Sequence, residues 1–111
     1  MCEHPFVGSQ IASLGADFQR AVQQGNVMRA EAAARQLGQL PLDQALRLLF
    51  LYAEKEPIKF DRAALRWLAR YVTEGKAVSL LKAQLALAAL SELRAGEREA
   101  AAKLLSELAR R

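Results

Sequence analysis

The chain has 111 residues and a formal net charge of +4, and 22 of its residues are alanine and 19 are leucine. Only eight residues are β-branched, so the composition favours helices and excludes an all-β fold. One cysteine and one histidine are too few for a structural zinc site or for a nucleophile with its base. We therefore expect an all-α protein that is not an enzyme and that has no catalytic residue, metal site or cofactor.

The first residues are expected to differ from the rest of the chain. Residues 1–8 are predicted to be an irregular lead-in, because Pro5 and Gly8 interrupt them. Residues 9–111 are predicted to form a single helical domain. The excess of positive charge lies in its second half, since residues 61–111 hold ten basic and six acidic side chains whereas the first sixty are neutral overall.

Three helices are predicted in the first half of the chain. From Ser9 onward apolar residues recur every three or four positions, which predicts a helix that ends at Gly25. Asn26 is a suitable N-cap for a second helix that continues to about Gly38. A third helix is predicted over residues 41–54, where a proline in the first turn loses no hydrogen bond.

The second half contains three further predicted helices. Asp61 is expected to cap a fourth helix that ends near Glu74, and Ser79 a fifth helix over residues 80–94. A sixth helix is predicted over residues 97–110, with acidic residues near its start. Six helices with short links predict three antiparallel pairs, arranged as a compact bundle or as a short right-handed α-solenoid-like stack.

A short pattern recurs in the second helix of each pair. Residues 32–37, 63–68 and 100–105 all read Ala-Ala-x-basic-x-Leu, and their starts are 31 and 37 residues apart. This spacing is typical of two-helix repeats. Chance similarity between alanine-rich helices explains the same pattern, so both interpretations stay open.

The predicted fifth helix is apolar almost all round. Between residues 80 and 90 only Lys82 and Gln84 are strongly polar. A helix of this kind is usually buried on several sides. We expect it to lie at the centre of the domain or to meet a second subunit.

The predicted fourth helix carries the candidate binding residues. Arg62, Arg66 and Arg70 are four residues apart and form one stripe, and Trp67 and Tyr71 lie on its flank. The opposite, core-facing side is predicted to consist of Leu65, Leu68, Ala69 and Val72. Together the arginines and aromatics suit phosphates and a stacked base or peptide side chain. We favour the other interpretation of the pattern, in which the aromatics fill a contact with a neighbouring helix and the arginines lie in water, because large aromatics are mostly core or interface residues.

The cellular compartment is predicted from the start of the chain and from its cysteine content. The N-terminal residues lack the basic start and apolar run of a signal peptide. The longest uncharged stretch, residues 4–16, contains polar residues and is too short to cross a bilayer. A single cysteine is typical of a reducing interior, so we expect a cytoplasmic protein with no membrane partner.

The segment from Leu42 to Leu93 resembles a family of short, functionally uncharacterised all-helical proteins of high-GC Gram-positive bacteria. The resemblance is carried by the patterns FxRAAxRWxxRY, from Phe60 to Tyr71, and AxLxLAAL, from Ala83 to Leu90. Many members have a histidine where this chain has Leu68, so any role of that histidine is absent here. The resemblance implies a bacterial origin and no activity. The helix pairs also look loosely like tetratricopeptide units, without their Trp, Gly, Tyr and Pro markers.

These observations predict a helical interaction module that binds a protein or peptide partner or associates with itself. The predicted partner-binding residues are Arg62, Arg66, Trp67, Arg70 and Tyr71. The alternative is a small basic nucleic-acid-binding accessory protein that uses the Arg62/Arg66/Arg70 row. A DNA-reading helix-turn-helix is not indicated, because the link before the fourth helix is long and partly acidic.

Overall fold

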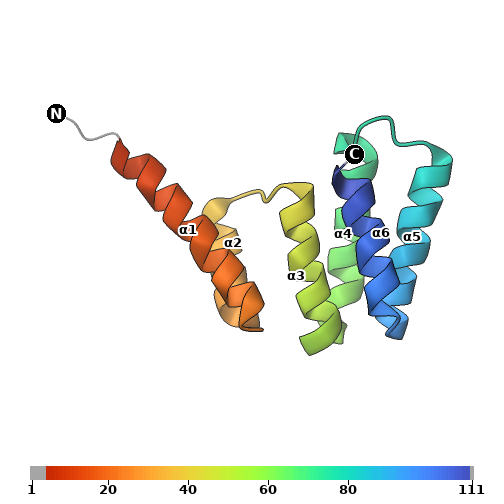
Figure 1. The fold of residues 1–111 in the computed structure, drawn as a ribbon, viewed down its shortest axis with the longest axis horizontal. Helices are drawn as coiled ribbons and strands as arrows, with labels where there is room; N and C mark the ends of the chain where they lie inside the picture. The colour runs from red at the N-terminus through yellow and green to blue at the C-terminus, as the bar shows by residue number, and fades with distance from the viewer. Residues whose placement is uncertain (1–4, 111) are drawn as a thin grey trace. The chain divides into compact units, whose positions relative to one another are not determined.

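The computed structural model describes the backbone of residues 5–110 and the side chains of residues 13–110. All regular secondary structure in this part is α-helical, and consecutive helices contact each other as α1 with α2, α3 with α4, and α5 with α6 (Figure 1). The all-α fold and the three helix pairs are thus confirmed. The helices are α1 (Pro5–Gln23), α2 (Val27–Leu37), α3 (Leu42–Lys55), α4 (Pro57–Glu74), α5 (Leu80–Ala95) and α6 (Arg98–Arg110).

The chain divides into two units, residues 1–40 and residues 41–111. The first unit is a hairpin of α1 and α2. Its turn contains Gly25 with a φ of 71°, and Asn26 caps α2 by accepting a 3.1 Å hydrogen bond from the Arg29 N–H. The expectation of a single domain over residues 9–111 stays a prediction.

The second unit is a four-helix bundle. In the described residues, α3 contacts α4, α4 contacts α5, α5 contacts α6, and α6 contacts α3 again, which closes the ring. An open stack of helix pairs would not return to its first helix in this way. The bundle alternative is therefore confirmed for this unit. Its buried residues include Leu46, Leu49, Phe60, Ala64, Trp67, Tyr71, Ala86, Ala89, Leu90, Leu93, Ala101 and Leu105.

Two helices begin earlier than the sequence indicated. Helix α1 begins at Pro5, so the lead-in predicted for residues 1–8 is wrong for its second half, and residues 1–4 lie outside the described part. Helix α4 begins at Pro57, and Asp61 lies in its second turn rather than at its cap. Both helices begin at a proline, whose fixed φ suits the first turn of a helix although proline also ends helices.

The link between α4 and α5 is tightly packed. A Cβ atom on Gly75 would lie 2.6 Å from the backbone oxygen of Tyr71 and 2.6 Å from a methyl group of Val78, so this position has no room for a side chain. Ala77 adopts a positive φ of 48°. Ser79 then caps α5 by accepting a 3.2 Å hydrogen bond from the Lys82 N–H. The link thus fixes where α5 starts relative to α4.

Candidate functional site

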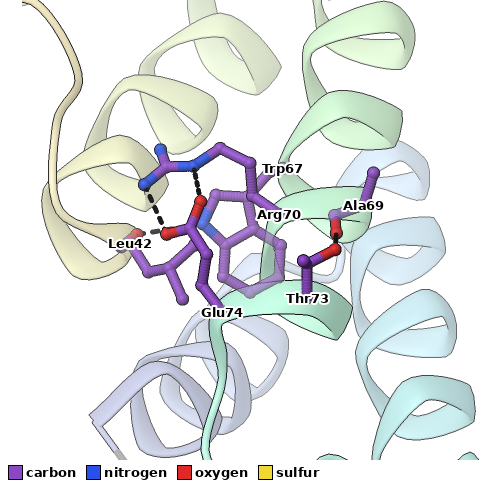
Figure 2. Close-up of polar contacts among 6 residues, drawn as sticks. All are labelled: Leu42, Trp67, Ala69, Arg70, Thr73 and Glu74. Atoms are coloured by element: carbon purple, nitrogen blue, oxygen red, sulfur yellow. Dashed lines mark hydrogen bonds and ion pairs between the residues drawn. The ribbon is translucent and has the colours of Figure 1, made fainter.

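The two aromatic residues of the predicted binding surface lie in the core of the bundle. Trp67 is 3% exposed and Tyr71 is 2% exposed. Their rings stack with centroids 5.2 Å apart and planes 7° from parallel. The Trp67 Nε1–H donates a 2.9 Å hydrogen bond to the backbone oxygen of Leu42, the first residue of α3 (Figure 2). Burial raises the pKa of the Tyr71 hydroxyl. The pair therefore holds α4 against α3.

The three arginines differ in their environments. Arg70 is engaged by Glu74, to which its Nε and Nη2 each donate a 2.9 Å hydrogen bond (Figure 2). These hydrogen bonds raise the pKa of Arg70 and lower the pKa of the Glu74 carboxyl. Arg62 and Arg66 are exposed and take part in no ion pair with another described residue. The structure thus does not bring the five predicted residues together on one surface.

The core-facing side of α4 was predicted wrongly. Leu65 is 64% exposed, and Val72 and Ala69 are also exposed. The buried side instead carries Phe60, Ala64, Trp67 and Tyr71. Large rings bury more apolar surface than leucine or valine, so the orientation that places three of them inside is the more stable one.

Helix α5 has one buried side, formed by Ala86, Ala89, Leu90 and Leu93. Its other sides are apolar but exposed, with Leu80 at 85% and Leu87 at 49%. The expectation that α5 lies at the centre of the domain is therefore wrong within the bundle. The expectation that it meets a second subunit stays a prediction.

Several large apolar residues of α4 and α5 are exposed, and we call the side of these two helices that carries them the α4–α5 face. Ile58, Leu65 and Val72 recur every seven residues on α4, and Leu80 and Leu87 do so on α5. This spacing keeps each set on one side of its helix. The full set of exposed apolar residues comprises Ile58, Leu65, Val72, Leu80, Leu81, Leu85 and Leu87.

A groove of about 320 Å³ runs between the two helices within this face. One end carries an ion pair, in which Arg94 Nε lies 3.3 Å from Asp61 Oδ1. The remaining walls are mostly apolar, formed by Phe60, Ala64, Leu65, Leu68, Leu87, Leu90 and Ser91. A groove of this composition suits an apolar ridge of another helix.

The sequence of α4 contains a signal for this surface in the spacing of its apolar residues. Ile58, Leu65 and Val72 are spaced seven residues apart and form an apolar stripe that is separate from the buried residues of the same helix. One helix that carries two apolar stripes is expected to contact two partners. The apolar α5 gave the same indication.

The described residues contain no cluster suited to a metal ion, and Cys2 and His4 lie outside them. A hollow between α1 and α2 and another between α3 and α6 are each lined by a single carboxylate, Asp17 and Asp43 respectively. No described helix is both long and apolar enough to span a membrane.

Comparisons with known proteins add no assignment. No family model, no curated protein and no solved structure matches this chain. The resemblance to the bacterial family described above stays a prediction.

Proposed function

We propose that this protein is a non-catalytic helical interaction module that binds a helix of a protein partner through its α4–α5 face. The observation that carries the proposal is the exposure of seven large apolar residues on two adjacent helices. Single exposed leucines are normal on protein surfaces, but here two of the exposed leucines, Leu65 and Leu87, line a mostly apolar groove, which is typical of interaction sites. A cytoplasmic setting and a bacterial origin belong to the proposal.

The shape of the face favours a helical partner. The groove between α4 and α5 is lined by Leu65, Leu68 and Leu87 beyond the ion pair at its one end. A third helix that packs against two antiparallel helices places its apolar side chains in such a groove. Arg62 and Arg66 are exposed on α4, one position beyond the groove-lining Asp61 and Leu65, so a partner helix with acidic residues on one flank would be complementary.

A selection from a library of displayed helical peptides tests this proposal. We expect the full chain to select amphipathic peptides whose binding is lost when Leu87→Glu or Leu65→Glu is introduced. Met28→Glu is the control, because Met28 is an exposed apolar residue on α2, outside the α4–α5 face. Selected peptides that bind all three variants equally, or no selected peptides at all, would contradict the proposal.

The nucleic-acid alternative is supported by one observation, the exposure of Arg62 and Arg66 without ion-pair partners among the described residues. Because Trp67 and Tyr71 are buried, this alternative depends on the arginine row without a stacking contribution from the two aromatics. It predicts binding that weakens steeply with salt and with loss of these arginines. If the protein is not retained on DNA or RNA at low salt, the nucleic-acid alternative is wrong.

A further inference from the structure

We infer that the partner of the α4–α5 face is a second copy of this chain, related by a twofold axis that runs parallel to α4 and α5. The inference rests on the proposed function, because it uses the same face. It is based on the distribution of charge across that face.

The Asp61–Arg94 ion pair defines how the two antiparallel helices are aligned. Arg62 follows Asp61 by one residue, and Glu92 precedes Arg94 by two. Because the chain advances only 1.5 Å per residue along a helix, Arg62 and Glu92 lie at nearly the same height. Arg66 lies one turn further along α4.

These charges lie on opposite edges of the face. Arg62 and Arg66 follow the groove-lining residues Asp61 and Leu65 by one position, and the 100° turn per residue carries them away from α5. Glu92 follows the groove-lining Ser91 by one position, and the same 100° turn places it on the side of α5 that faces away from α4. The face therefore has a basic edge on α4 and an acidic edge on α5. Between them lie the Asp61–Arg94 ion pair at the height of Arg62 and Glu92, and leucines further along the groove.

A twofold axis parallel to the helices makes this face complementary to itself. It places α4 of one copy over α5 of the other, so each basic edge meets an acidic edge and the apolar residues meet in the middle. An axis perpendicular to the helices would place α4 over α4, with like charges opposite each other. Because like charges in contact oppose association, the charge pattern selects the first arrangement.

The charges are also available for such pairs. Arg62, Arg66 and Glu92 are exposed, and none of them takes part in an ion pair with another described residue. The interval between Lys82 and Glu92 on α5 contains no charged residue, and the two charges within the groove, Asp61 and Arg94, already form an ion pair with each other. One chain thus supplies the basic edge, the acidic edge and the apolar residues of the proposed interface.

Sedimentation equilibrium of the full chain at low salt tests the inference by charge exchange. We expect the wild type to dimerise, and Arg62→Glu or Glu92→Arg alone to raise the dimer Kd about tenfold, because two symmetric pairs are lost per dimer. The double variant should restore the wild-type Kd to within about threefold. Arg29→Glu, an exposed charge reversal on α2, is the control and should leave the Kd unchanged.

Several outcomes would overturn the inference. A wild type that stays monomeric up to about 1 mM shows no specific self-association. A dimer that is insensitive to either reversal, or that the double variant does not restore, uses a different surface or axis. A monomer that binds vesicles of anionic lipid through the same leucines would assign the face to a membrane surface.

Failure here and failure of the proposed function are distinguishable. If the chain is monomeric but still selects helical peptides whose binding is lost in Leu87→Glu, the inference of a second copy is wrong and the proposed interaction module is retained. A monomer without such peptides would overturn both. Trp67 fluorescence and circular dichroism confirm in each case that the variants are folded, since Trp67 is the single tryptophan and lies in the core.

Discussion

Helices α3 and α5 are both rich in leucine, yet they differ in how far their leucines are buried in the bundle. Leu46 and Leu51 of α3 are five residues apart and thus about 140° apart around the helix, and both are buried. Leu80 and Leu87 of α5 are largely exposed. The comparison shows that the apolar content of a helix does not by itself distinguish a helix that is buried on several sides from a helix that has an exposed apolar side.

The largest expected effect comes from truncating one leucine in each helix. Leu46→Ala removes a side chain that is 1% exposed and leaves a cavity, so it should lower the free energy of unfolding by about 2–5 kcal/mol. Leu87→Ala, measured at protein concentrations low enough to keep the chain monomeric, should lower it by less than about 1 kcal/mol. Urea denaturation followed by Trp67 fluorescence measures both. Equal losses would show that the two helices do not differ in burial.

A smaller effect should come from the polar contact that anchors α4 to α3. Trp67→Phe keeps an aromatic ring beside Tyr71 but removes the donor to the Leu42 backbone oxygen. We expect a loss of about 1–3 kcal/mol, from the unmade hydrogen bond and the smaller ring. Circular dichroism must report unfolding here, because the variant lacks the fluorophore. An unchanged stability would mean that the indole does not connect α4 to α3.

The smallest effect concerns the exposed ion pair between Arg70 and Glu74, on the same helix as Trp67. The pKa of Glu74 is lower in the folded chain than in the unfolded chain, so the stabilisation is present above the unfolded pKa and is lost as the pH falls through the folded value. Glu74→Gln should remove this part of the acid sensitivity, and salt should weaken it in the wild type. Thermal unfolding between pH 3 and pH 7 measures the difference. A Glu74→Gln variant that is as acid-sensitive as the wild type would contradict the assignment.

Most of the fold could be predicted from the sequence, because helix formation depends on local signals. Asn26 and Ser79 cap their helices as expected, since their side chains act within one turn. The starts of α1 and α4 were wrong because a proline near a helix boundary suits both an end and a beginning. Which helices belong to the same bundle depends on contacts between residues that are far apart in the sequence. Local sequence signals do not predict these contacts.

The candidate site was less predictable than the fold. Trp67, Tyr71 and Arg66 lie within one turn or so of each other in the sequence, yet two are buried and one is in water. Periodicity gives the angle between residues around a helix but not which angle faces the core. Packing against α3 decides that, because it offers the Leu42 backbone oxygen to the indole.

The central claim is that the leucines of the α4–α5 face meet a second copy while those of α3 stay inside one copy. A dilution series of the full chain with labelled leucine methyl groups, followed by NMR, tests it most directly. We predict that the methyl signals of Leu65, Leu80 and Leu87 shift with concentration and that those of Leu46 and Leu49 do not. Signals that are all independent of concentration, or shifts confined to other leucines, would contradict the account.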